Sequence, residues 1–581
     1  MSVTQIPGKD APLETSIARM QATLAAAGFQ VEESAWLNPV EGVWSVHLRD
    51  RDCPLIYVNG KGGSQLAARA SALGEFFERL CCNYFWSHYY WGARAGAAGF
   101  VHYPQERWFP LGDGEAWPAD LLDENLQAFY NPRGNIPARA LVDFNSGNAA
   151  RGICALPFQR QRDGATLYFP INVIANLYVS NGMSAGNSPA EAQTQALSEI
   201  FERYVKFKVI AEGLCLPEVP EDVIARYPRI AAGIAGLRAA GFGILVKDAS
   251  LGGQFPVMNV TLLHPGDRGC YASFGAHPRF EVALERALTE LLQGRALDGL
   301  AGFPEPGFDL EEAASAPNLE IHFVDSSGVL HWNFLRREAD FPFCDWNFGG
   351  ASSTGERDWL VNRVQELGHD VYLAEFGHLG VYVCRILVPG LSEIYPLDDL
   401  EWENTSVITD LRAPILALDG LEDEACGDLL DALIDRGIAD DRPVAALLGL
   451  APDEGYWKSL RVGELKTQLA LACGDREAIL EGCQWARYFE EIDPERRRLY
   501  ACVECLVKLE DLGNGADVAE DFGLPLTQLY GPAVLAQAQA LLDGELRFPG
   551  FLPLGADLEA SDLHRRLMAG YARLQASRTE R

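Results

Sequence analysis

Hydrophobic and polar positions follow two periods in the first part of the chain. Apolar residues with helical spacing run through residues 17–24 and end near Gly28, and apolar and polar residues then alternate through 44–48, as in a strand. We expect this strand region to continue to a turn at Asn59-Gly60. The chain therefore begins with one helix followed by β-structure.

The order strand, loop and long helix then occurs three times. The first loop is residues 61–64; the second unit has an apolar strand at 170–179, a loop at 181–188 and a helix from Pro189. Ser188 and Glu191 flank the start of that helix as a cap and a glutamate three residues later. The third unit has strands at 255–264 and 270–275 and a helix opened by His277-Pro278.

Beyond residue 400 the strand period disappears. Residues 301–400 alternate strands and short helices, whereas 462–475, 476–490 and 496–511 show apolar spacing of three and four residues. A chain of 581 residues also exceeds what one core usually organises. We predict an α/β (α+β) body over residues 1–400 with three related strand-loop-helix units, and an all-α, tetratricopeptide-like interaction domain over 401–581.

The acidic composition of the chain limits the kinds of molecule that it is expected to bind. A formal charge of −33 disfavours direct binding to nucleic acid or to an anionic membrane surface. The N-terminus lacks the pattern of a secretory signal, and the longest uncharged stretch, 167–190, is too polar to span a bilayer. We expect a cytoplasmic protein whose 13 cysteines are reduced thiols.

An internal repeat carries the candidate chemistry. Residues 72–79 read ALGEFFER, residues 196–203 read ALSEIFER, and residues 287–294 read ALTELLQG. The offset of 124 residues between the first two copies also aligns Ser64 with Ser188 and Gly62 with Gly186. The three helices therefore follow one template.

The repeat gathers acidic side chains on one face of each helix. These are Glu75 and Glu78, Glu199 and Glu202, and Glu290. For one copy, a solvated salt-bridged face is the simpler interpretation, but three related copies favour convergence. Two carboxylates about 4 Å apart repel by roughly 4 kcal/mol at an effective dielectric of about 20, so converging glutamates need cations.

The chemistry of this set favours a nucleoside triphosphate site. Carboxylates without histidine or cysteine suit Mg²⁺ or Ca²⁺, and Mg²⁺ often shares its coordination with phosphate oxygens. Arg79, Arg203 and Arg286 would bind phosphate. The site is not a P-loop, because GxxxxGK[ST] is absent.

These helices, the opening Pro7-Gly-Lys-Asp10, the helix with Ser16 and the loop 181–187 together resemble the YcaO family over roughly residues 1–400. The resemblance implies an ATP-binding fold with Mg²⁺ held among the helices. Carried onto this sequence, it implies that nucleotide is contacted by Lys9, Ser16, Ser71, Arg79, Asn187, Glu191, Arg203 and Arg286. It assigns Mg²⁺ to Glu75, Glu78, Glu199, Glu202 and Glu290, and leaves the catalytic residues unknown.

The resemblance further implies that ATP phosphorylates an amide oxygen of a protein or peptide substrate. Azoline-forming members end in a proline-rich tail, whereas this chain ends ALQASRTER, which argues against peptide heterocycle formation. The resemblance is greatest to the long stand-alone bacterial proteins, one of which is described as an accessory factor for β-methylthiolation of a small-subunit ribosomal protein, alongside a radical methylthiotransferase. Relatives also suggest a homodimer. The alternative is a nucleotide-sensing scaffold that docks a modifying enzyme without doing the chemistry.

Overall fold

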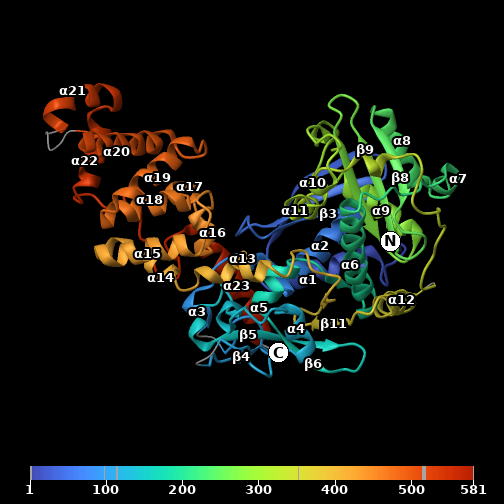
Figure 1. Cartoon of the computed structure of the whole chain (residues 1–581). Helices are drawn as coiled ribbons and strands as arrows, with labels where there is room; N and C mark the ends of the chain where they lie inside the picture. Colours follow the sequence, from blue (N-terminus) through green and yellow to red (C-terminus); the bar gives the residue numbers. More distant parts are fainter. Residues whose placement is uncertain (1–2, 97–98, 113–114, 351, 513–517, 580–581) are drawn as a thin grey trace.

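Three antiparallel sheets organise the body of the protein (Figure 1). The computed structural model describes residues 3–96, 99–112, 115–350, 352–512 and 518–579. The sheets have the orders β1-β2-β3, β10-β9-β8 and β4-β5-β11-β12-β7, with β6 also paired to β5. Their strands are β1 (Val31–Val40), β2 (Val43–Asp50), β3 (Tyr57–Gly62), β4 (Arg107–Phe109), β5 (Ile153–Arg160), β6 (Thr166–Pro170), β7 (Met183–Gly186), β8 (Gly243–Asp248), β9 (Val257–Leu263), β10 (Cys270–Ala276), β11 (Tyr372–Phe376) and β12 (Tyr382–Leu387).

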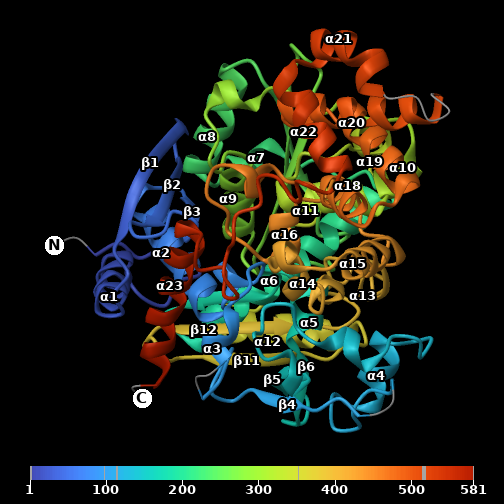
Figure 2. The same ribbon diagram turned by 90° about the vertical axis from the view of Figure 1, so that its left-hand side faces the viewer.

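The body helices lie between and around these sheets (Figures 1 and 2). They are α1 (Leu13–Ala26), α2 (Gln65–Cys81), α3 (Gly92–Gly96), α4 (Glu124–Tyr130), α5 (Ile171–Val173), α6 (Pro189–Ala211), α7 (Glu221–Ile224), α8 (Pro228–Ala239), α9 (Phe280–Leu291), α10 (Leu310–Ala314), α11 (Ala316–Val324) and α12 (Ser353–Glu366). Ser64 and Ser188 cap α2 and α6 by accepting the N–H of Ala67 at 3.2 Å and of Glu191 at 3.1 Å. Two aligned serines therefore start two equivalent helices.

Each glutamate-bearing helix follows a strand at the end of its sheet. These strand-helix pairs are β3 with α2, β7 with α6, and β10 with α9. A glycine in each strand permits close packing: a Cβ on Gly275 would lie 2.3 Å from the backbone nitrogen of Ala287, and one on Gly186 would lie 2.8 Å from that of Ala192. The predicted three strand-loop-helix units are confirmed in this form.

The turn predicted at Asn59-Gly60 is wrong, because both residues lie inside β3. The chain turns earlier, where the N–H of Ile56 donates to the carbonyl of Cys53 at 3.0 Å. A Cβ on Gly60 would meet the carbonyl oxygen of Ala68 at 2.3 Å, so the glycine serves contact with α2 instead of a turn.

The strand predicted at 170–179 is also wrong. After Pro170 the chain forms α5 and then a π-helical turn at Ile174–Tyr178. Asn172 donates to Asn404 at 2.9 Å, and Asn176 accepts from Thr405 at 3.0 Å. These long-range partners favour a helical spacing that a short apolar run cannot reveal. The strand of the second unit is β7, inside the predicted loop at 181–188.

The third helix starts at Phe280, two residues after the predicted opening at His277-Pro278. Neighbouring segments hold the preceding residues extended: the N–H of His277 donates to Pro256 at 2.9 Å, and the N–H of Phe348 donates to Pro278 at 2.8 Å. The backbone of this segment therefore bonds outside the helix.

A helical region follows the body and lies to one side of it in Figure 1. No strand occurs among the described residues from 399 onward. The helices are α13 (Asp399–Trp402), α14 (Arg412–Leu416), α15 (Asp423–Asp435), α16 (Val444–Leu448), α17 (Tyr456–Ser459), α18 (Val462–Cys473), α19 (Arg476–Tyr488), α20 (Pro494–Leu512), α21 (Val518–Tyr530), α22 (Pro532–Leu542) and α23 (Asp562–Thr579). The predicted fold class, an α/β body with a helical C-terminal region, is confirmed.

The last helix returns to the body. Tyr571 and Leu574 of α23 share a hydrophobic core with Phe76 and Phe77 of α2, and the indole N–H of Trp86 donates to the carbonyl of Leu567 at 2.9 Å. The end of the chain therefore packs against the first glutamate-bearing helix. Among the described residues, no helix is long and apolar enough to cross a membrane.

Candidate functional site

Equivalent faces of α2, α6 and α9 line one cavity of about 560 Å³. The aligned positions are Ser71, Gln195 and Arg286; Glu75, Glu199 and Glu290; and Glu78, Glu202 and Gln293. Every residue that the sequence analysis assigned to nucleotide or metal lies on this wall, including Lys9, Ser16, Arg79, Asn187, Glu191 and Arg203. The repeat therefore brings its polar faces together in three dimensions.

Two of these helices carry the same internal ion pair. On α2, Nη2 of Arg79 lies 3.2 Å from Oε1 of Glu75. On α6, Nη2 of Arg203 lies 3.1 Å from Oε1 of Glu199. Each guanidinium also lies over an aromatic ring. Cζ of Arg79 is 4.1 Å from the ring centre of Tyr84, and Cζ of Arg203 is 4.7 Å from that of Phe323. The pairs hold the arginines against the cavity wall, where they face its interior.

Lys61, at the end of β3, contributes a cation that the sequence analysis did not select. Its ammonium group pairs with Glu290 and donates to Gln293 at 3.1 Å. Burial lowers the pKa of Lys61 from its usual value. The loop predicted at 61–64 is wrong at its start, because Lys61 and Gly62 lie in β3. A residue placed in a loop gave no reason to expect its side chain beside Glu290.

The end of β10 links α6 with α9. The backbone N–H of Ala276 donates to Glu202 at 3.0 Å, and the carbonyl of the same residue accepts from Arg286 at 2.6 Å. One residue of the third unit thus orients an acid of the second helix and an arginine of the third.

The N-terminal segment covers the start of α6. Lys9 lies 3.2 Å from Glu191, and Asn187 donates to the same carboxylate at 2.9 Å. Ser16 donates to the side-chain oxygen of Asn187 at 2.7 Å, so α1 is joined to the second repeat unit. These four residues, which the family resemblance assigned to nucleotide, form one hydrogen-bonded group.

The electrostatics of the cavity favour bound charges of both signs. Burial raises the pKa of Glu78 well above its ordinary value, and Glu199 raises it further; burial also raises the pKa of Glu202. Among the described residues, Nε of Arg79 and Nη1 of Arg203 are buried without a hydrogen-bond partner. The acids would be stabilised by a cation, and the two N–H groups by an anion such as phosphate.

The carboxylates are distributed around the wall instead of gathering at one point. Within the described part of the chain, no three of them bring ligand oxygens within 4.8 Å of one another. This arrangement fits Mg²⁺ ions that keep waters and share phosphate oxygens better than it fits a closed protein cage. The residues present therefore fit Mg²⁺ together with a polyphosphate.

Further charged residues of α9 line the cavity and were missed. Glu281 and Glu285 are four residues apart, so they lie on the same helical face. Burial raises the pKa of Glu285. A helical projection of α9 would have shown this acidic face, but neither residue has an acidic counterpart in the other two copies of the repeat.

Comparison with known protein families gives two matches. Residues 59–392 match the family described as YcaO cyclodehydratase, ATP- and Mg²⁺-binding, and residues 409–580 match the YcaO cyclodehydratase C-terminal domain. The chain is 48% identical to the ribosomal protein S12 methylthiotransferase accessory factor YcaO of Escherichia coli (strain K12), covering 100% of this chain and 99% of that one. It is 44% identical to an uncharacterized protein of Haemophilus influenzae, covering 99% of both chains.

Solved structures with a similar chain path share little sequence. A heterocyclase in complex with substrate and cofactor has a TM-score of 0.46 and 17% identity, covering 69% of this chain and 57% of that chain. YcaO from Methanopyrus kandleri, bound with AMPPCP and Mg²⁺, has a TM-score of 0.43 and 18% identity, covering 67% of this chain and 94% of that chain.

Proposed function

Because the chain belongs to the YcaO family, we propose that it is an ATP- and Mg²⁺-dependent enzyme that activates an amide or related carbonyl group of a protein or peptide by phosphorylation. The observation that supports this most strongly is the placement of equivalent glutamates and arginines from three helices in one cavity. A purely structural set of salt bridges would not require about 560 Å³ of space between the helices.

In this proposal the five glutamates of the repeat hold Mg²⁺. Glu75 and Glu199 already pair with arginines, whereas Glu78 and Glu202 have pKa values raised by burial. Binding of Mg²⁺ would favour their ionised form, because a nearby cation lowers the pKa of a carboxyl group. The metal would also offset the repulsion between carboxylates on neighbouring helices.

The nucleotide-binding residues divide into two groups. Arg79, Arg203 and Arg286 offer N–H donors near the glutamates, suited to phosphate oxygens. The remaining residues lie near the start of α6 or along α2: Lys9, Ser16, Ser71, Asn187 and Glu191. The cluster of Lys9, Ser16 and Asn187 joins three chain segments, so it can fix the position of a bound nucleotide.

When bound, ATP supplies the phosphoryl group whose transfer to an amide oxygen makes the carbonyl carbon electrophilic. The contribution of the protein is to hold the reactants in line and to neutralise charge with the arginines and Lys61. Such a transfer requires no covalent intermediate on a serine or cysteine. The catalytic residues are therefore proposed to act by position and charge.

In this proposal the reaction takes part in the modification of a small-subunit ribosomal protein. The Escherichia coli relative is named an accessory factor for the S12 methylthiotransferase, and its identity extends over the full length of this chain. We propose the same accessory role in β-methylthiolation here, with a radical methylthiotransferase as partner and a homodimer as the active form. Light scattering would measure the oligomeric state.

A second function, a nucleotide-sensing scaffold, is favoured by one feature of the helical region. Leu524 and Leu529 on α21 and Tyr488 at the end of α19 are 72%, 68% and 79% exposed. Apolar side chains left on a helical surface suit docking of another protein. Nucleotide turnover separates the two proposals, because a sensor binds ATP without consuming it.

Phosphorus NMR of ATP incubated with the full chain, Mg²⁺ and the candidate ribosomal protein tests the enzyme proposal. We expect consumption of ATP that stops on chelation of Mg²⁺ and in Glu199→Gln, and the product signals identify ADP or AMP. The matched control, Glu481→Gln on the exposed face of α19, should retain turnover. Binding without turnover would support the scaffold, and turnover unchanged in Glu199→Gln would contradict the assigned site.

A further inference from the structure

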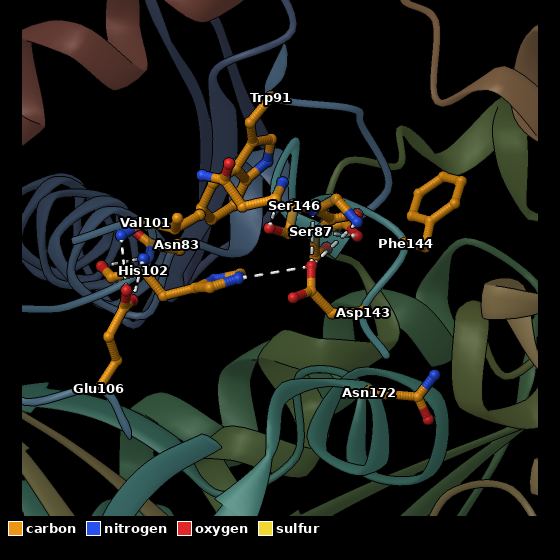
Figure 3. Close-up of polar contacts among 12 residues, drawn as sticks. Asn83, Ser87, Trp91, Val101, His102, Glu106, Asp143, Phe144, Ser146 and Asn172 are labelled. Carbon is orange, nitrogen blue, oxygen red and sulfur yellow. Dashed lines mark hydrogen bonds and ion pairs between the residues drawn. The ribbon is translucent and has the colours of Figure 1, made fainter. Parts of the chain in front are cut away.

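A separate cluster of buried polar side chains includes none of the residues that line the glutamate cavity. Figure 3 shows two of its members, His102 and Asp143, with their polar contacts. A ring nitrogen of His102, a carboxylate oxygen of Asp143 and the sulfur of Cys154 all lie within 4.8 Å of one another. The three residues are 2%, 2% and 0% exposed. Among the described residues this is the one group of three histidine, cysteine or acidic side chains that approach so closely.

Three atoms at this cluster have unused lone pairs or hydrogens. Nε2 of His102, Oδ2 of Asp143 and Oδ1 of Asn145 are buried without a hydrogen-bond partner in the described part of the chain. Nε2 of His102 lies 3.5 Å from Oδ1 of Asp143, which is too long for a good hydrogen bond. A buried polar atom without a hydrogen-bond partner destabilises the fold, so a group that joins these atoms would stabilise it.

Surrounding hydrogen bonds orient the cluster. Oδ1 of Asp143 accepts the N–H groups of Asn145 at 3.1 Å and Ser146 at 2.7 Å, which leaves Oδ2 available. The amide nitrogen of Asn145 donates to the carbonyl of Ser87 at 2.9 Å, which fixes the direction of its oxygen. Partners of this kind hold metal ligands in place in metalloproteins.

Glu106 is a neighbour whose carboxylate is already used. It accepts the backbone N–H groups of Val101 at 2.8 Å and His102 at 2.6 Å (Figure 3). It also accepts the indole N–H of Trp108 at 2.8 Å. It therefore holds the loop that presents His102. Burial raises the pKa of the Cys154 thiol, and Glu106 is among the charges that raise it further.

We propose that His102, Asp143 and Cys154 bind a zinc ion, with a water in the fourth position. Nitrogen, carboxylate oxygen and sulfur together suit Zn²⁺ and not Mg²⁺, which prefers oxygen ligands alone. Both His102 and Asn145 line a small adjoining cavity of about 50 Å³, which has room for a water. On binding, the zinc ion would exchange waters of hydration for the three side-chain ligands, and the Cys154 thiol would lose its proton to solvent, with no change of oxidation state.

The position of the cluster gives the metal a role in joining the two parts of the chain. Arg578 of α23 donates to the carbonyl of His102 at 2.8 Å, and Arg412 of α14 donates to the carbonyl of Phe144 at 2.9 Å. The ring of Trp91 packs on His102, with centres 4.4 Å apart. A zinc ion here would hold together the segments around His102 and Asp143, which contact the last helix and the helical region respectively.

Elemental analysis of the full chain, purified without a metal-affinity column, tests the proposal. We expect about one zinc per chain in the wild type, and a loss to background in Cys154→Ala and Asp143→Asn. Two controls should retain the zinc: Cys483→Ala, an equally buried cysteine on α19, and Glu199→Gln in the glutamate cavity. Zinc retained in Cys154→Ala, or absent from the wild type, would overturn the site; the second result would mean that a buried water bridges these side chains.

A second measurement covers the case in which the variants fail to fold. Wild-type protein is stripped with a chelator, titrated with Co²⁺ in the presence of excess Mg²⁺, and followed by absorption. A thiolate-to-cobalt charge-transfer band that saturates near one equivalent is expected, because the site contains one cysteine. Absence of that band would refute ligation by Cys154 whatever the state of the variants.

Discussion

Replacing Gly60 with alanine should move the first glutamate-bearing helix and damage the site without changing any proposed ligand. The new Cβ would lie 2.3 Å from the carbonyl oxygen of Ala68 and 2.5 Å from both the nitrogen and the Cβ of Ala72, all on α2. Ordinary contacts begin near 3.4 Å, so strand and helix would have to separate by about 1 Å. Overpacking of this kind costs about 1–3 kcal/mol.

The same displacement would move Glu75 and Glu78, because α2 carries both. A shift of about 1 Å at a reacting centre can lower a rate about 100-fold. Calorimetry should show a lower melting temperature for the body, and ATP turnover should fall about 10- to 100-fold. The control, Gly377→Ala, places its Cβ where no atom lies within 4 Å and should match the wild type. A Gly60→Ala variant with wild-type melting and turnover would refute the steric argument.

Three further perturbations test separate parts of the account. Glu78→Gln should raise the melting temperature of the metal-free protein at neutral pH. Burial raises the folded-state pKa of Glu78, so the stability of the wild type falls as pH rises from the ordinary glutamate pKa through the raised one, and glutamine removes this loss. A variant that melts below the wild type in the presence of chelator would contradict this reasoning. Arg203→Lys should raise the KM for ATP about 10-fold, since a hydrogen bond to a charged group contributes about 1.5–3 kcal/mol; an unchanged KM would exclude Arg203 from nucleotide binding. Tyr571→Ala should destabilise the body by about 3–5 kcal/mol, because this side chain packs on Trp86 and Trp91 of the body; calorimetry showing a loss only in the helical region would be the opposing result.

The helix starts, the glutamate-bearing helix faces and the helical C-terminal region could be predicted from residues close together in the sequence. The capping serines at 64 and 188 start equivalent helices, and the repeated glutamates face one cavity. The helical region after residue 400 was also predicted, because its apolar spacing is long and regular. These features depend on neighbours within one turn or one repeat.

Features decided by distant partners were not predictable in the same way. Residues 171–178 are helical, and their Asn172 and Asn176 bond to residues more than 200 positions away, which the local apolar run does not indicate. Gly60 signals a turn by composition but serves contact with a helix that follows it. Lys61 becomes a cavity residue only when β3 is placed beside Glu290. In each case the deciding contact is absent from the local pattern.

The most direct test of the central claim is calorimetric titration of the full chain with a non-hydrolysable ATP analogue, with and without Mg²⁺. Glu199→Gln and the surface control Glu481→Gln are titrated alongside the wild type. The account predicts Mg²⁺-dependent binding at one site per chain in the wild type and the control, and a large loss of affinity in Glu199→Gln. Binding that is independent of Mg²⁺, or equally tight in Glu199→Gln, would contradict the assignment of the glutamate cavity as the nucleotide site.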